Sequence, residues 1–188
     1  MYIFFEKYVK HKQQVKNNSS TKRGWDAHRQ ELAGYNEIRE KEHDWGVERP
    51  TAVCWVYCAE TDAEAHEGAL QYMTEYGDSA LRHYQFLGDH LQKTKGYEYY
   101  GEMAKMRNAL PADTDPDDIY LSDHIWGSPA TCLEKLRSVN DQMGTNDFIA
   151  VFSYGSMPVE KAEKSMRLFA EHVLTTAQDF TPGELPTI

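Results

Sequence analysis

Apolar residues fall in short unbroken runs in two places along the chain. The run at 51–59 reads TAVCWVYCA, and the run at 148–152 reads FIAVF. Continuous apolar runs rich in β-branched and aromatic residues are typical of strands covered on both faces, as in a parallel sheet. His124-Ile125-Trp126 predicts a third, shorter strand.

Between these runs, apolar residues recur at three- and four-residue spacing, which predicts amphipathic helices. The helices are expected over 26–44, 62–76, 129–143 and 159–174. The side chains expected to face inward are Leu32, Tyr35 and Ile38, then Ala65, Ala69, Tyr72 and Met73, then Leu133, Leu136, Val139 and Met143, and finally Ala162, Met166, Phe169 and Val173.

Particular residues predict where the helices begin and end. Thr61 or Asp62 is a suitable N-cap for the second helix, because a short polar side chain can accept a hydrogen bond from the first turn. Ser128 is the expected N-cap of the third helix, with Pro129 at its first position. Gly144 is expected to end that helix.

The order of elements predicts an α/β fold with about three parallel strands and flanking helices. Residues 77–121 interrupt this alternation and are expected to form short helices and loops, an insertion of the kind that often shapes a substrate site. Residues 1–22 are basic and turn-rich and are expected to be a tail or linker, and 176–188 a C-terminal tail.

Charge and cysteine content narrow the functional classes. The net charge is −10, from 20 basic and 30 acidic residues, which disfavours a nucleic-acid partner. No run is long and apolar enough to cross a bilayer.

The three cysteines do not fit a disulfide framework, so a cytoplasmic protein is expected. Cys54 and Cys58 would lie about 13 Å apart on one strand face, at ~3.3 Å per residue, as small core residues. The eight histidines are dispersed, and no metal-binding pattern is present.

Two longer segments carry a family resemblance. Trp126–Leu136 reads WGSPATCLEKL, and Asp147–Pro158 reads DFIAVFSYGSMP. Together with the helix at 165–174 and the segment Val53–Ala65, they resemble the C-terminal end of the bacterial luciferase-like monooxygenases. In that family a Gly-Ser/Thr/Asp-Pro helix start precedes a strand that ends in a Gly/Tyr-rich turn.

The resemblance implies a (β/α)₈ TIM-type barrel, which needs ~250 residues. Residues 23–175 would supply only its C-terminal part, strands six to eight. It also implies reduced FMN, or a deazaflavin in some branches, with O₂ and a small, apolar organic substrate. A flavin reductase is a possible partner, and the chain would form a homo-oligomer or pair with a chain carrying the first half of the barrel. The alternative is a truncated flavin-binding homologue or subunit without turnover of its own.

The resemblance also implies candidate residues for the functional site. Gly127, Ser128 and Gly155 are expected at the cofactor, since a helix N-terminus suits a phosphate. Plain helix capping is the alternative for Gly127 and Ser128. Tyr154 is the catalytic candidate, or else a tyrosine packed in the turn. Trp55, Val53 and Tyr97 are candidates for the substrate pocket. Core packing is the alternative for Trp55, and an exposed loop is the alternative for the insertion that contains Tyr97.

Overall fold

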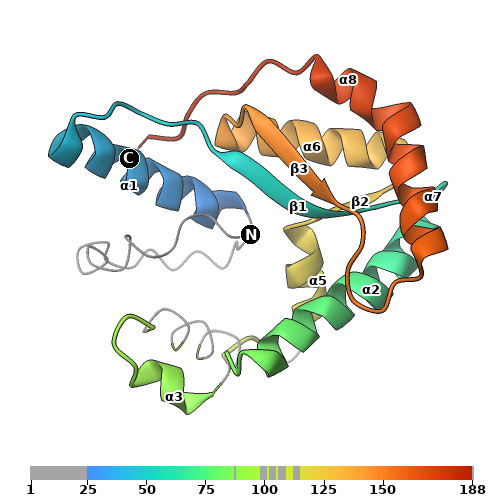
Figure 1. Cartoon of the computed structure of the whole chain (residues 1–188), viewed down its shortest axis with the longest axis horizontal. Helices are drawn as coiled ribbons and strands as arrows, with labels where there is room; N and C mark the ends of the chain where they lie inside the picture. The colour runs from blue at the N-terminus through green and yellow to red at the C-terminus, as the bar shows by residue number, and fades with distance from the viewer. Residues whose placement is uncertain are drawn as a thin grey trace.

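The computed structural model describes residues 25–86, 88–97, 101, 105, 109–111 and 115–187. Its centre is an open sheet of three parallel strands (Figure 1). The strands are β1 (Thr51–Cys58), β2 (Ile125–Gly127) and β3 (Asp147–Val151). The predicted α/β class, with three parallel strands and flanking helices, is therefore confirmed. The predicted tail over residues 1–22 lies outside the described residues.

The described helices lie close to their predicted positions. They are α1 (Trp25–His43), α2 (Asp62–His83), α3 (Asp89–Gln92), α5 (Pro116–Ser122), α6 (Pro129–Met143), α7 (Val159–Phe169), the π-helical turn η2 (Ala170–Leu174) and α8 (Thr175–Gln178). The predicted end of the second helix at 76 is wrong, because α2 continues to His83. The expected caps are confirmed: Thr61 caps α2, Ser128 caps α6, and Gly144 ends α6 in the left-handed conformation.

The strand order is β2-β1-β3, so the first strand lies in the middle. In a barrel wound in sequence order, the second of three consecutive strands would lie between the other two. Here the connection from β1 to β2 and the connection from β2 to β3 cross the sheet in opposite directions. Right-handed crossovers then place α2 and α6 on opposite faces, as Figure 1 shows. The open sheet is consistent with part of a barrel-like fold but is covered on both faces.

Alternate residues of β1 supply two separate cores. Cys54, Val56 and Cys58 pack with the apolar face of α6 and with Phe169 and Val173. Tyr57 and Ala59 pack on the other face with α2 and with residues that follow β3. The predicted burial of Cys54 and Cys58 is confirmed, and all three cysteines are free thiols.

Two predicted inward positions are wrong. Tyr35 is 36% exposed, and the buried face of α1 is formed by Leu32, Ala33 and Asn36. Met166 is 48% exposed, while Ser165 is buried in its place. In both helices a small or polar residue is buried because it serves a hydrogen bond, which hydrophobic periodicity does not detect.

Side chains complete the hydrogen bonding of β1 beyond the end of β3. β3 pairs with β1 only as far as Trp55. Past that point, the Tyr154 hydroxyl donates to Val56 O at 3.1 Å, and Cys58 N–H donates to Ser165 Oγ at 2.8 Å. Both groups are buried, so β1 has a satisfied edge without further strand pairing.

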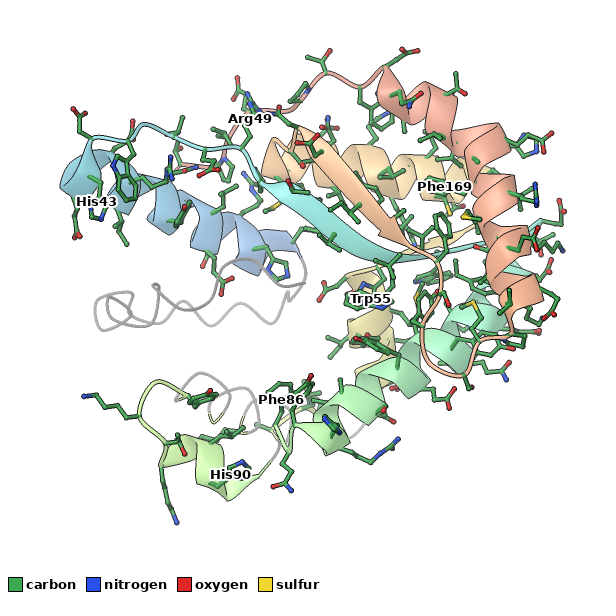
Figure 2. The ribbon with its side chains drawn as sticks, in the orientation of Figure 1. His43, Arg49, Trp55, Phe86, His90 and Phe169 are labelled. Atoms are coloured by element: carbon green, nitrogen blue, oxygen red, sulfur yellow. The ribbon has the colours of Figure 1, made fainter. Side chains whose placement is uncertain are left out.

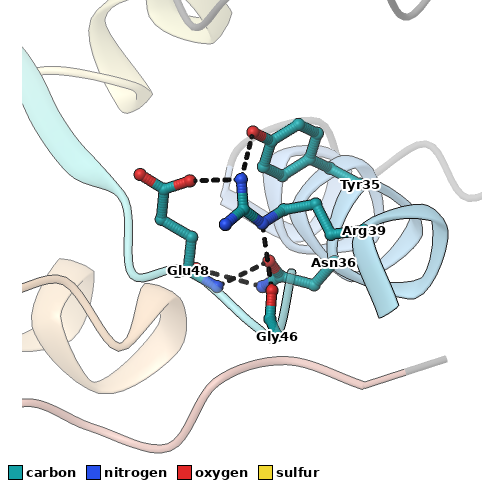
Figure 3. A network of polar contacts seen from close by, with 5 residues as sticks. All are labelled: Tyr35, Asn36, Arg39, Gly46 and Glu48. Carbon is teal, nitrogen blue, oxygen red and sulfur yellow. Dashed lines mark hydrogen bonds and ion pairs between the residues drawn. The ribbon is translucent and has the colours of Figure 1, made fainter. Parts of the chain in front are cut away.

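A polar network fixes the connection between α1 and β1 (Figure 3). Asn36 forms two hydrogen bonds with the backbone of Glu48, at 3.1 and 2.9 Å. Arg39 contacts Gly46 O at 3.0 Å and the Glu48 carboxylate at 2.8 Å. Asn36 thus takes the place of a backbone partner for Glu48. The connection between α1 and β1 therefore enters β1 at a fixed angle.

The C-terminal segment lies against the sheet and α6. Arg49 Nη1 donates to Gly144 O at 2.7 Å and to Gly183 O at 2.8 Å. The Asn140 amide donates to Thr181 O at 2.7 Å, and Phe180 and Leu185 pack against the core. The start of β1 is therefore joined to residues near the C-terminus. Across the described stretches, none of the helices has both the length and the apolar character that a bilayer crossing requires.

Candidate functional site at the carboxyl ends of the strands

Three loops follow the carboxyl ends of the strands, and parallel strands place those ends at one edge of the sheet. β1 leads through Ala59 into α2, β2 leads directly into α6, and β3 leads into the turn before α7. Ala59 N–H donates to Gly127 O at 3.1 Å. Ser128 N–H donates to Asp62 Oδ1 at 2.6 Å. The loops after β1 and β2 are thus directly joined.

Gly127 and Ser128 form a tight strand-to-helix turn. Gly127 has φ +146°, and a Cβ there would lie 2.5 Å from Thr131 Cγ2. Ser128 Oγ accepts from Thr131 N–H at 3.5 Å, which is the N-cap geometry. Glycine is required here because both its conformation and the space exclude a side chain.

The Asp62 carboxylate occupies the anion position at the start of α6. Its pKa is lowered chiefly by the hydrogen bond from Ser128 N–H, with further bonds from Thr131 and Ser128 hydroxyls. A carboxylate oxygen therefore already stands where the helix N-terminus favours negative charge. A phosphate could use Ser128 N–H only after displacing Asp62.

Lys135, nearly two turns from the start of α6, adds a cation that the sequence did not single out. Its Nζ donates to Trp126 O at 2.8 Å and lies 3.5 Å from the centre of the Trp126 ring. Partial burial lowers its pKa, while the negative charge of Asp62 acts in the opposite direction. The sequence did contain a feature that could have identified Lys135. It is a lysine next to the apolar face of a helix, and that helix begins at a candidate anion site.

Tyr154 points into the sheet. It is 6% exposed, and its hydroxyl donates to Val56 O. Burial raises its phenol pKa above the ordinary value. A phenol held in this way is a weak acid and a structural donor, so the catalytic role of Tyr154 stays a prediction that requires its hydroxyl to leave Val56.

The turn after Tyr154 lies against α2. Gly155 has φ +59°, and a Cβ at this position would lie 3.1 Å from Tyr72 O. The hydroxyl of Ser156 hydrogen-bonds the Glu75 carboxylate. Gly155 therefore allows close approach of the loop to α2, which orients the third loop of the candidate site.

Trp55 belongs to an aromatic cluster on the α2 face of the sheet. Its ring centre lies 5.3 Å from that of Tyr76 and 5.0 Å from that of His124. Tyr120 contacts His124 from the other side at 4.7 Å. Figure 2 shows Trp55 between β1 and the helices α2 and α5. The cluster joins one predicted pocket residue, Trp55, to His124, which the sequence placed only in a short strand.

The other predicted pocket residues lie elsewhere or contribute less. Val53 precedes Trp55 by two residues, so it shares a face of β1 and is half-buried. Tyr97 is 48% exposed, and its backbone N–H donates to Thr94 O, just beyond α3. Tyr97 is thus an exposed loop residue. Among the described residues, no group of His, Cys, Asp or Glu side chains could hold a metal ion.

Comparisons with known proteins give a fold likeness. No family model matches the chain, and no curated protein sequence matches it. Among solved structures, one similar chain is the oxygenating constituent of 3,6-diketocamphane monooxygenase from Pseudomonas putida, a type II Baeyer–Villiger monooxygenase in complex with FMN. It has a TM-score of 0.50 and 19% identity, and the match covers 86% of this chain and 42% of that one.

Two further structures have lower scores. The monooxygenase RslO1 from Streptomyces bottropensis has a TM-score of 0.47 and 18% identity, and the match covers 79% of this chain and 38% of that one. Apo-MsnO8 has a TM-score of 0.42 and 23% identity, covering 82% and 42%. The chain thus spans about two-fifths of the length of these proteins. What it shares with the 3,6-diketocamphane enzyme is the fold.

Proposed function

We propose that the chain is the C-terminal part of a flavin-dependent monooxygenase that uses reduced FMN and O₂ to oxidise a small apolar organic molecule. The proposal rests on the similarity of its α/β fold to that of an FMN-bound monooxygenase. The segments that resemble the luciferase-like family support it, because they span the carboxyl ends of β1, β2 and β3 and the residues that follow each strand.

The residues at the start of α6 fit an anionic group. Gly127 gives close backbone approach, Ser128 supplies an N–H and a hydroxyl, and Lys135 supplies a half-buried ammonium. The Asp62 oxygen on Ser128 N–H is a stand-in for a phosphate oxygen. In the proposed holo form the phosphate replaces it and Lys135 balances the charge. The flavin, when bound, supplies the reaction with O₂. A deazaflavin is the alternative cofactor.

The apolar surroundings of Trp55 suit an uncharged substrate. Trp55, Val53 and Tyr76 present carbon surface, and His124 next to them is buried. An anionic substrate would lose its hydration there without a paired cation, which is costly. In this proposal Trp55 packs against the substrate, and Tyr154 becomes a hydrogen-bond donor if its hydroxyl leaves Val56.

The remainder of the active site would come from a partner. β2 and β3 are the outer strands of the described sheet, and the match covers only 42% of the 3,6-diketocamphane monooxygenase chain. We propose pairing with a polypeptide that carries the first part of the fold, or with a second copy, and delivery of reduced flavin by a reductase.

Titration with FMN and with riboflavin tests the proposal. The two ligands differ only in the phosphate, so tighter binding of FMN reports a phosphate contact. Lys135→Met is expected to weaken FMN about tenfold and to leave riboflavin unchanged, since one charge-assisted contact is worth about 1.5–3 kcal/mol. Lys161→Met, on the exposed part of α7, is the control. Equal affinities for both ligands in a folded sample would contradict the phosphate site.

A flavin-binding subunit without turnover is the second candidate. The buried, backbone-bound Tyr154 hydroxyl favours it, because the catalytic candidate at this edge is already engaged by Val56 O. The two functions differ in one assay. With reductase-supplied flavin, substrate-dependent O₂ consumption supports the enzyme, and FMN binding without such consumption supports the subunit.

A further inference from the structure

The outer side of β3 is the open edge of the described sheet. β3 stands at one end of the strand order β2-β1-β3 and is drawn in orange in Figure 1. None of its residues is buried, whereas most of β1 beside it is buried. At the opposite edge, Ile125 and Gly127 of β2 are buried. Because Gly127 has no side chain, its burial means that the backbone of β2 itself is covered.

The backbone of β3 leaves hydrogen-bonding groups at this edge. Successive residues of a strand direct their N–H and C=O groups to opposite sides, so about half of those in β3 point away from β1. None of the described strands pairs with them. The register with β1 runs from Asp147 to Val151 without a bulge, so the edge is continuous. Such an edge can accept a strand from another chain.

The sequence of β3 lacks the features that keep an edge strand unpaired. Natural edges are protected by lysine, proline, a bulge or an inward-pointing charge. Asp147–Val151 reads DFIAV and Phe152 follows, so the only charge is at the start of the strand. Ile149 is 52% exposed, the largest exposure of an apolar side chain in this sheet. An uncharged run with high β-propensity at an open edge favours association with another strand.

The charge pattern of β3 is compatible with pairing to itself. In an antiparallel pair centred on Ile149, each Ile149 lies opposite Ile149 of the second copy. Phe148 lies opposite the smaller Ala150, and Asp147 lies opposite Val151. The two Asp147 carboxylates are then at opposite ends of the paired segment, so no like charges face each other. A parallel pairing in register would place them side by side.

Symmetry also favours this arrangement. A twofold axis uses the same edge of both copies, so the assembly closes at two chains. A head-to-tail assembly would need the β3 edge of one copy to meet the β2 edge of the next, and the β2 edge is covered. The twofold pair joins the two sheets through β3 and buries both Ile149 side chains against each other.

We propose that the chain forms a twofold dimer by antiparallel pairing of β3 with β3 of a second copy, centred on Ile149. The proposal rests on the second-copy form of the pairing proposed above. It uses the side of the sheet and not the loops at the carboxyl ends of the strands, so it does not require flavin. A monomeric chain that binds FMN more tightly than riboflavin would overturn the dimer and leave the flavin proposal standing.

Sedimentation velocity of the full chain over a dilution series tests the dimer. We expect a reversible monomer–dimer equilibrium. Ile149→Lys places two ammonium groups opposite each other, so it should raise the dimer dissociation constant at least tenfold. Val159→Lys is the control, because Val159 is 73% exposed at the start of α7. A chain that stays monomeric at millimolar concentration, or an Ile149→Lys variant that dimerises like wild type, would overturn the proposal.

Two further variants locate the pairing. Ile149→Glu should also dimerise poorly, but mixed with Ile149→Lys it should form a heterodimer, because opposite charges then face each other. A general loss of folding would not be rescued by mixing. The three native cysteines are buried, so a short bis-maleimide should join two Ile149→Cys chains through their introduced thiols and leave Val159→Cys chains largely single. No heterodimer, or equal cross-linking of both cysteine variants, would refute the register.

Discussion

At the scale of single residues, the buried polar side chains explain most about the local structure. Asn36, Ser165 and Tyr154 each complete a backbone hydrogen bond, whereas the His124 nitrogens have no such partner among the described residues. The first three explain local structure. Lys135 is the residue that the proposed phosphate site would use, and hydrophobic periodicity could detect neither it nor His124.

His124 should make the fold sensitive to acid. Its pKa is near 6.5 when unfolded and about 3 in the folded chain because burial disfavours its charged form. The unfolded state therefore takes up the proton first, and stability falls as pH drops from about 6.5 toward 3. Between pH 7 and 4.5 this amounts to about 2–3 kcal/mol.

Urea unfolding of wild type and His124→Phe over that pH range checks this expectation. The stability difference between the two proteins should move in favour of the variant as pH falls. Asp123 and Tyr120 face the same region and are present in both proteins, so their titration largely cancels. A difference that is independent of pH would contradict the neutral, buried imidazole.

Tyr154→Phe tests the structural role of the hydroxyl. Removing it leaves Val56 O buried without its partner, so the free energy of unfolding should fall by about 1–2 kcal/mol. Ser138→Ala, at an exposed position, is expected to change stability by less than about 0.5 kcal/mol. Unchanged stability of the Tyr154 variant would mean that the hydroxyl is free for chemistry.

At the scale of elements, the turn from β2 into α6 is the most constrained. Gly127→Ala should destabilise the fold by more than about 2 kcal/mol, because it combines an unfavourable φ with contact against Thr131 and Asp62. Gly46→Ala is the matched control, since Gly46 also has positive φ but no atom within 4 Å of its Cβ position. Thermal unfolding of both variants separates conformational strain from steric conflict, and equal losses would contradict the close packing.

The elements themselves were largely predictable. The unbroken apolar runs gave β1 and β3, and the Ser128-Pro129 start and Gly144 end gave α6, because strands buried on both faces and helix caps have strong local signals. The extension of α2 to His83 was missed because its last turns have no regular apolar face. Trp55 was expected to line a substrate pocket or to pack in the core, whereas its neighbours Tyr76 and His124 come from distant segments that local patterns cannot bring together.

At the scale of the whole molecule, the strand order β2-β1-β3 is the main result that the sequence could not predict. Order depends on which edge of β1 each later strand joins, and no local pattern encodes that choice. With β1 in the middle, helices cover both faces of the sheet. The chain thus has two cores of its own, although its match covers only 42% of the 3,6-diketocamphane monooxygenase chain whose fold it shares.

Arg49 joins the two ends of this arrangement. Arg49→Met removes its bonds to Gly144 O and Gly183 O, so the segment after α8 should loosen. We expect faster proteolytic cleavage within 179–187, followed by mass spectrometry, with little change for Arg29→Met on the exposed side of α1. Equal cleavage of the Arg49 variant and wild type would mean that Phe180 and Leu185 hold the segment without it.

The most direct test of the flavin proposal is the position of FMN-induced shifts in a backbone amide NMR spectrum of the full chain. The proposal predicts the largest changes at Asp62, Ser128 and Thr131, where phosphate replaces the Asp62 carboxylate, and smaller changes at Gly155. Riboflavin should leave the first three unchanged. Absence of shifts at these residues at saturating FMN, or shifts confined to other parts of the chain, would contradict a flavin phosphate site at the start of α6.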